Sequence, residues 1–209
     1  MKTKIYFIES SSDFNNSHLN SPLIAGSEKT LINITNELSK NNDLIIKVFN
    51  NTKEPVTKDN LEWNNISQIK KYDNPDFVIA MSDVNLLSLV NCEKKFLWSH
   101  SVQPFEKFLR KKQFFSFFKN KPTMILEGKY HYKTRSFFTS FYGKKILPIA
   151  VDYEFINAKI DNNKKKEKKA IFTTRSDRNL NFLIDCWREI IKKSENSSLW
   201  INPPYNISE

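Results

Sequence analysis

The sequence predicts an α/β fold with a Rossmann-like, doubly wound parallel sheet, on three observations. Short apolar runs alternate with helical patterns along the first 150 residues. Runs such as 43–49 and 76–81 are continuously apolar, which is typical of strands buried on both faces of a sheet. The chain has 209 residues, of which 39 % are hydrophobic, enough to build a core. Strand–helix alternation of this kind predicts a parallel sheet covered by helices.

The first 90 residues are expected to hold three strands. Each is a short apolar run bounded by polar residues: 4–9, 43–49 and 76–81. The segments between them are interpreted as helices over 28–42, 61–72 and 82–90. In the first helix Leu31, Ile34 and Leu38 share one face, with Ser27 as the N-cap. The segment 61–72 is ambiguous. Ser82 or Asp83 is expected to open the third helix.

The chain from 94 to 150 continues the same alternation. Strands are predicted at 94–99, 122–127 and 144–150, and helices at 104–119 and 129–142. Gly143 follows the last helical residue, where glycine commonly closes a helix in the left-handed conformation. We expect His100 to follow the end of its strand at the carboxyl edge of the sheet, where ligands of open α/β sheets bind.

The chain is divided into an N-terminal domain over 1–156, a charged linker over 157–169 and the start of a second domain over 170–209. The linker is the most polar and charged stretch of the sequence. After it come a strand from 170, a helix over 179–196 and a strand over 198–202. That helix has a wide apolar stripe that needs a sheet to cover. We therefore expect an incomplete second domain and a chain that is a fragment.

Charge and composition restrict the function classes. The net charge of +10 implies an anionic partner, namely nucleic acid, an anionic membrane surface or a phosphorylated ligand. Three glycines are too few for GxGxxG or Walker A loops. The two cysteines have no paired spacing, so neither a disulfide framework nor a zinc site is expected. The N-terminus looks like a strand and not a signal peptide, which predicts a reducing cytoplasm.

Two arginines lie in the turn TTRSDRNL (173–180), between the strand that starts at 170 and the helix that follows. Arg175 and Arg178 would there join the free N–H groups of a helix N-terminus, a combination that suits a phosphate. For an isolated arginine pair, a solvated turn is the alternative.

Four segments in the same order resemble the retaining glycosyltransferases of the GT-B fold, specifically the family-four group. The segment 21–49 is similar to that family's opening, where a glycine and a glutamate begin the first helix. KKFLWSHSVQPFE (94–106) resembles its strand ending in a histidine. The segment 123–159 is similar to the stretch that ends in "Ile-Pro-Asn-Gly-Val-Asp", and 172–201 resembles the opening of its second domain. The resemblance therefore implies two Rossmann-like domains.

The resemblance also implies an activity, the transfer of a sugar from a nucleotide-sugar donor with retention of configuration. By position Arg178 matches the family's basic residue that holds the donor diphosphate, and Arg175 would assist it. His100 matches a histidine that faces the donor sugar and is the candidate catalytic residue. The nucleotide-sugar is a substrate, so no cofactor and no essential metal are expected. The acceptor would be a glycan or a lipid-linked molecule.

Further site residues follow from position. Gly26 and Glu28 occupy the turn after the first strand, the acceptor or phosphate loop, where close backbone approach to a ligand favours glycine; a simple helix start is the alternative. His131 and Lys133 could face the cleft, although a solvated helix face is the better interpretation.

The chain also departs from the family pattern. Asn179 replaces a common glycine, a mild change because asparagine tolerates the left-handed conformation. The family's late pair of glutamates has no counterpart in these 209 residues, so activity of this chain alone is in doubt.

A basic, aromatic stretch, residues 104–121, interleaves six phenylalanines with six lysines and arginines. Half of the rings are expected in the core. The remaining rings lie beside cations in the sequence, a combination that suits an anionic membrane surface. The protein would then be a peripheral protein at the inner face of the membrane. Stacking on single-stranded nucleic acid is the less favoured use.

Two function classes follow from these features. One is the glycosyltransferase, with an inverting or epimerising relative of the same fold as its enzyme rival. The other is a non-catalytic basic α/β module that binds nucleic acid or an anionic membrane.

Overall fold

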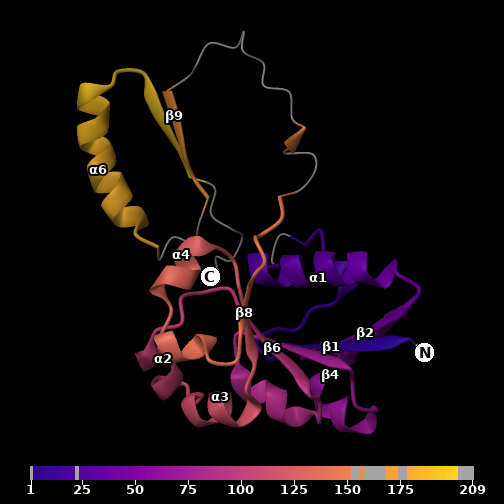
Figure 1. The fold of residues 1–209 in the computed structure, drawn as a ribbon. Coiled ribbons are helices and arrows are strands. Elements are labelled where there is room, and N and C mark those ends of the chain that lie inside the picture. The colour runs from indigo at the N-terminus through magenta and orange to yellow at the C-terminus, as the bar shows by residue number, and fades with distance from the viewer. Residues whose placement is uncertain (1, 22–23, 152–155, 158–167, 174–177, 202–209) are drawn as a thin grey trace. The chain divides into compact units, whose positions relative to one another are not determined.

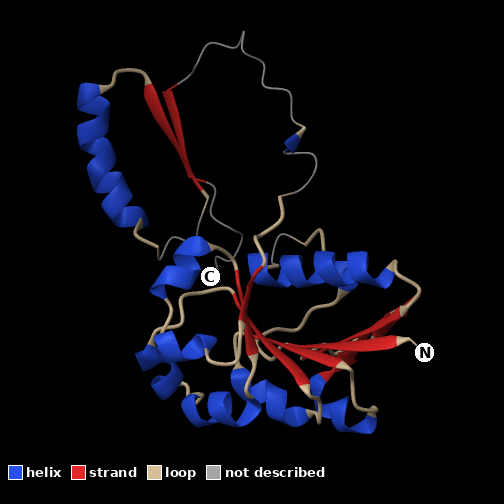
Figure 2. Cartoon of the chain, viewed as in Figure 1, coloured by secondary structure: helices blue, strands red, loops and turns tan. Residues whose placement is uncertain are grey.

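The computed structural model describes residues 2–21, 24–151, 156–157, 168–173 and 178–201. The chain forms two compact units, one made of Met1–Asn20 and Ile24–Ala150, the other of Ser21–Leu23 and Val151–Glu209. Figure 1 traces the chain and Figure 2 its helices and strands. Most of the predicted linker 157–169 lies outside the described residues, and its last two residues already belong to a strand.

The first unit is built on an eight-stranded sheet with the order β3-β4-β2-β1-β5-β6-β7-β8. Every neighbouring pair is parallel except β3 and β4. The strands are β1 (Thr3–Ile8), β2 (Leu44–Asn50), β3 (Val56–Lys58), β4 (Leu61–Asn65), β5 (Phe77–Met81), β6 (Lys94–Ser99), β7 (Thr123–Leu126) and β8 (Lys144–Ile146). Without β3, the order along the chain is 3-2-1-4-5-6-7, which is the doubly wound Rossmann arrangement. The predicted α/β, Rossmann-like class is confirmed.

Helices and 3-10 turns connect these strands. They are η1 (Asn16–His18), α1 (Gly26–Ser39), η2 (Ile66–Lys71), η3 (Val84–Leu89), α2 (Phe105–Arg110), α3 (Phe114–Asn120), α4 (Lys129–Thr134) and η4 (Phe137–Ser140). Figures 1 and 2 show α1 on one side of the sheet and α2 and α3 on the other. The sheet is therefore a middle layer, and its carboxyl edge lies next to the N-terminus of α1.

The core consists of two apolar clusters separated by the sheet. Tyr6 and Ile8 belong to one cluster, whereas Phe7 between them belongs to the other, because successive side chains of a strand point to opposite faces. The α1 residues Leu31 and Ile32 are fully buried in the second cluster. Strands with two buried faces explain the continuous apolar runs of the sequence.

The predicted helix over 61–72 is wrong. Residues Leu61–Asn65 form strand β4, which pairs in parallel with β2, and only Ile66–Lys71 coil, as a 3-10 turn. Leu61 and Trp63 are buried while Glu62 between them is half-buried, the two-residue period of a strand. Strand β3, not predicted, pairs with β4 at the sheet edge.

The predicted helices after β5, β6 and β7 are shorter than expected. The segment 82–90 holds a 3-10 turn, and 104–119 is divided into α2 and α3 at Lys112, whose φ is +53°. This break brings Phe108 of α2 and Phe117 of α3 to a ring distance of 5.7 Å in one core. The segment 129–142 holds α4 and η4, and Gly143 beyond it has the expected positive φ, +103°.

The described part of the second unit contains β9 (Lys168–Phe172), α6 (Leu180–Lys193) and β10 (Ser197–Ile201). The two strands are parallel, with Ala170 opposite Leu199. Asn179 has φ +62° immediately before α6, as expected for an asparagine in place of glycine. No residue of α6 is fully buried. Among all described residues, no helix is both long and apolar enough to cross a bilayer.

Candidate functional site at the switch point of the sheet

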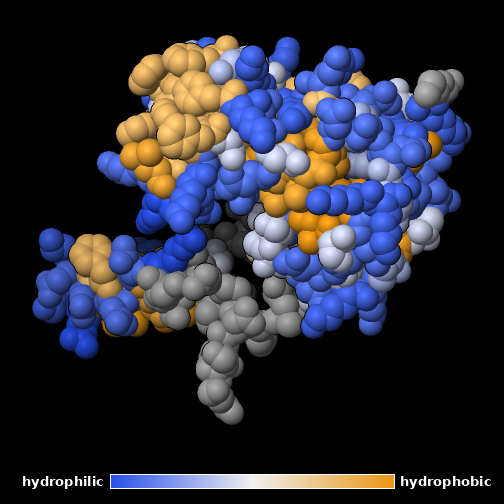
Figure 3. Space-filling model, turned by 90° about the horizontal axis from the view of Figure 1, so that it is seen from below, coloured by the Kyte–Doolittle hydropathy of each residue, from blue (hydrophilic) through white to orange (hydrophobic). Residues whose placement is uncertain are grey.

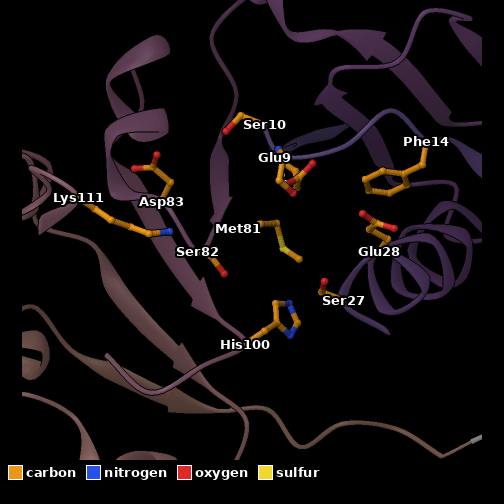
Figure 4. Close-up of a pocket in the computed structure, with 11 residues that line it drawn as sticks. Glu9, Ser10, Phe14, Ser27, Glu28, Met81, Ser82, Asp83, His100 and Lys111 are labelled. Atoms are coloured by element: carbon orange, nitrogen blue, oxygen red, sulfur yellow. Dashed lines mark hydrogen bonds between the residues drawn. The ribbon is translucent and has the colours of Figure 1, made fainter. Parts of the chain in front are cut away.

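A pocket of about 160 Å³ lies at the carboxyl edge of the sheet, where the strand order reverses between β1 and β5. Open α/β sheets bind ligands at such a switch point. In Figure 4 the side chains of Glu9, Glu28 and His100 are arranged around Met81. The lining residues are Glu9, Ser10, Ser11, Phe14, Ser27, Glu28, Met81, Ser82, Asp83, His100 and Lys111.

The loop after β1 presents Glu9 to the pocket. Its carboxylate is buried and accepts hydrogen bonds from the hydroxyl of Ser11 and from the backbone N–H of Ser11 at 2.6 Å. The backbone N–H of Ser12 adds a longer bond at 3.3 Å. These donors compensate the burial of the charge, which would otherwise be costly. The loop therefore holds a carboxylate in place at the pocket wall.

Helix α1 contributes its first turn. The helix begins at Gly26, so Ser27 is a helical residue and not the expected N-cap. The carboxylate of Glu28 accepts a hydrogen bond from the backbone N–H of Ala25 at 2.8 Å, which satisfies one donor of the helix start. A Cβ built on Gly26 meets no atom within 4 Å among the described residues. The backbone at Gly26 is thus open to approach by a ligand.

The turn after β5 carries Ser82 and Asp83. Ser82 has φ +58°, a left-handed conformation that is uncommon for serine. Its N–H donates to the carbonyl of Trp98 on β6 at 2.9 Å, which fixes this turn against the neighbouring strand. The carboxylate of Asp83 accepts from the N–H of Asn85 at 2.9 Å and so caps η3, as the sequence predicted.

His100, directly after β6, forms a close pair with Glu127, directly after β7. The His100 Nδ1 lies 2.5 Å from Glu127 Oε1, and the two side chains are 14 % and 20 % exposed. Since an ionised carboxylate only accepts, Nδ1 carries the proton and the pair fixes the orientation of the ring. His100 Nε2 is buried and has no hydrogen-bond partner among the described residues. The ring of His100 therefore lines the pocket, while its Nε2 is closed off from solvent and left without a hydrogen-bond partner in the described part of the chain.

The charges of the pocket are mixed. The carboxylates of Glu9, Glu28 and Asp83 lie on its wall with the cation of Lys111 and the imidazole of His100. Carboxylates accept hydrogen bonds from hydroxyl and amine groups, and they repel a phosphate. This lining favours a polyhydroxylated ligand over a phosphate.

The other predicted site residues lie elsewhere. His131 on α4 is buried, which corrects the expected solvated face, and its Nδ1 is 3.5 Å from the backbone N of Glu127. Lys133 is exposed, and neither residue lines this pocket. Arg178 is exposed two residues before α6, in the second unit. Arg175 lies outside the described residues.

Sequence reasoning missed three acidic groups of the site, namely the pocket residues Glu9 and Asp83 and the His100 partner Glu127. Glu9 and Glu127 directly follow strands β1 and β7, and Asp83 was interpreted only as a helix cap. The signal for Glu127 was present, because the register pairs Ser99 with Leu126 and so places His100 beside Glu127. That register depends on β6 and β7 being neighbours. The described residues contain no group of three or more His, Cys, Asp or Glu side chains that could hold a metal ion.

No protein-family model matches the chain. A search of curated proteins finds no match either.

Proposed function

We propose that this chain is part of a retaining glycosyltransferase of the GT-B type, which transfers a sugar from a nucleotide-sugar to a glycan or lipid-linked acceptor. The observation that carries the proposal is the pocket at the switch point. It is lined by carboxylates and by His100, whose buried Nε2 has no partner among the described residues. An unpaired buried nitrogen is costly, and a hydroxyl of a bound sugar would satisfy it once the ring turns to bring Nε2 into the pocket.

In the proposed reaction the bond between the anomeric carbon and the phosphate oxygen of the donor breaks. The oxygen of the acceptor hydroxyl bonds to that carbon on the same face, and the hydroxyl proton leaves with the nucleoside diphosphate. Arg178 would stabilise the charge that develops on the diphosphate. His100, held by Glu127, would contact the donor sugar, and Glu28 beside Gly26 would accept from hydroxyl groups of the acceptor.

Calorimetric titration with uridine-, guanosine- and adenosine-diphosphate sugars tests the proposal. At least one should bind, and Arg178→Ala should weaken it. One charge-assisted hydrogen bond contributes about 1.5–3 kcal/mol, which corresponds to roughly 10- to 100-fold in affinity. Arg188→Ala is the matched control, since Arg188 is an exposed arginine on α6. Equal losses in the two variants, or no binding of any donor, would contradict the proposal.

A further inference from the structure

We propose that the first unit docks on an anionic lipid bilayer through an aromatic face formed by α2, α3 and the segment 137–141. This face is defined by five exposed side chains, Phe105, Leu109, Phe115, Phe137 and Phe141. The inference is independent of glycosyl transfer, because it depends only on the shape and charge of this surface.

The aromatic face is unusually exposed for apolar side chains. Phe115 is 84 % exposed, Phe137 is 78 % and Phe141 is 57 %, while Phe105 and Leu109 are about half exposed at 47 % and 50 %. Single exposed apolar residues are common on proteins, but a group of them marks a binding surface. Figure 3 shows one group of hydrophobic side chains at the upper left of the view and a second group nearer its centre.

Ring contacts connect the four phenylalanines of this face through Phe114 and Phe138. Phe105 and Phe115 both contact Phe114, at centroid distances of 5.5 and 5.6 Å. Phe137 contacts Phe141 at 5.6 Å and Phe138 at 6.1 Å. Phe138 also contacts Phe105 and Phe114, so it joins the two segments.

Buried rings underlie this surface and hold it in place. Phe108, Phe117 and Phe138 are at most 2 % exposed and pack edge to face in the core. We expected about half of the six rings in 104–121 to be buried in the core. Phe108 and Phe117 are buried, so the expectation is confirmed in part. The outer rings are therefore presented on a packed base, which lowers the entropy lost when they enter an interface.

The positive charge of the chain is concentrated in the two sequence segments that carry this face. Residues 104–121 and 128–150 together carry eleven of the 33 Lys and Arg but only one of the 23 Asp and Glu, Glu106. The rest of the chain thus has 22 residues of each sign and is balanced. The whole excess of +10 lies in the two segments that carry the exposed phenylalanines. Exposed rings among cations complement a surface that is apolar inside and anionic at its headgroups.

Two local observations agree with this assignment. Burial, together with the neighbouring cations Lys111 and Arg110, lowers the pKa of Lys107, so positive charges already crowd this site. Lys111 also lines the switch-point pocket, so a bilayer at the aromatic face would lie close to that pocket.

A vesicle-binding assay with the full chain tests the proposal. Sedimentation should show binding to phosphatidylcholine vesicles that contain about 30 % phosphatidylglycerol, and at least tenfold weaker binding without the anionic lipid. Phe115→Ser with Phe137→Ser should reduce binding about tenfold or more, since both rings would lose their apolar contact. Lys112→Glu with Lys119→Glu should do the same, and more strongly at low salt.

Control variants distinguish binding through the aromatic face from nonspecific adsorption to vesicles. Phe182 on α6 is 69 % exposed, so Phe182→Ser should leave vesicle binding unchanged. Lys58→Glu on β3 with Lys70→Glu in η2 makes the same charge change away from the two basic segments. A Phe115→Trp reporter adds a direct readout, because its emission should shift to the blue on anionic vesicles and be quenched by brominated acyl chains.

Three outcomes would overturn the proposal. The first is vesicle binding that the Phe115 and Phe137 changes leave intact, and the second is equal binding to neutral and anionic vesicles. The third is a single-stranded oligonucleotide that binds tightly and loses its affinity in these variants while vesicles do not bind, which would assign the face to nucleic acid.

Discussion

Replacing Glu127 with alanine should destabilise the protein and release the ring of His100. The Nδ1–Oε1 distance is 2.5 Å, and both side chains are at least four-fifths buried. A hydrogen bond to a charged group contributes about 1.5–3 kcal/mol to the free energy of unfolding. With a urea dependence of about 1–3 kcal/mol per molar, the unfolding midpoint should fall by about 1 M.

Two measurements check this prediction. Urea denaturation should show the midpoint shift, with Glu37→Ala as the control. The Glu37–Lys40 pair also joins a carboxylate to an N–H donor, at 2.6 Å, but its side chains are 70 % and 69 % exposed, so its loss should cost about 0.5 kcal/mol or less. Nitrogen NMR of the imidazole should show the proton on Nδ1 of His100 in the wild type and a tautomer mixture in Glu127→Ala. If both variants shift the midpoint equally and the tautomer is unchanged, the role assigned to Glu127 is refuted.

Three further predictions concern the backbone and the core. Burial raises the pKa of Tyr6 to about 12, above the value of about 10 in an unfolded chain. The stabilisation that comes from keeping Tyr6 neutral should therefore be present below pH 10 and lost between pH 10 and 12. Absorbance at 295 nm follows the ionisation of Tyr6, and unfolding at each pH follows the stability. Gly143→Ala should lower the free energy of unfolding by about 1–3 kcal/mol, measured by heat or urea, because φ is +103° and the new Cβ would lie 3.2 Å from Thr123 Oγ1. The control Gly128→Ala should lower it much less, because a Cβ there meets no atom within 4 Å among the described residues. Gly26→Ala should leave the unfolding midpoint unchanged or higher, yet weaken nucleotide-sugar binding in calorimetry if the ligand approaches this backbone.

The sequence was sufficient for six of the eight strands of the sheet and insufficient for the edge strands β3 and β4 and for the helices around it. Strands such as β1, β2 and β5 are buried on both faces, so their apolar runs are unmistakable. The prediction of a helix over 61–72 was wrong because a five-residue strand followed by a 3-10 turn has too few residues for its period to be distinctive. The break at Lys112 depends on tertiary packing of Phe108 and Phe117, which local propensity does not contain.

The candidate site was predicted in its location but not in its composition. Glycine at position 26 and the histidine after β6 indicated the carboxyl edge of the sheet, and His100, Glu28 and Ser27 do line the pocket there. The carboxylates of Glu9 and Asp83 became visible only when the strand order put the ends of β1 and β5 side by side.

Chemical-shift mapping during titration with nucleotide-sugars is the most direct test of the proposed function. We expect one donor to shift the imidazole signals of His100 and the backbone signals of Ser10 and Ser82. The ring of His18, which caps η1 away from the pocket lining, should not respond. Shifts confined to residues outside the pocket, or none with any donor at millimolar concentration, would contradict a sugar-nucleotide site in this chain.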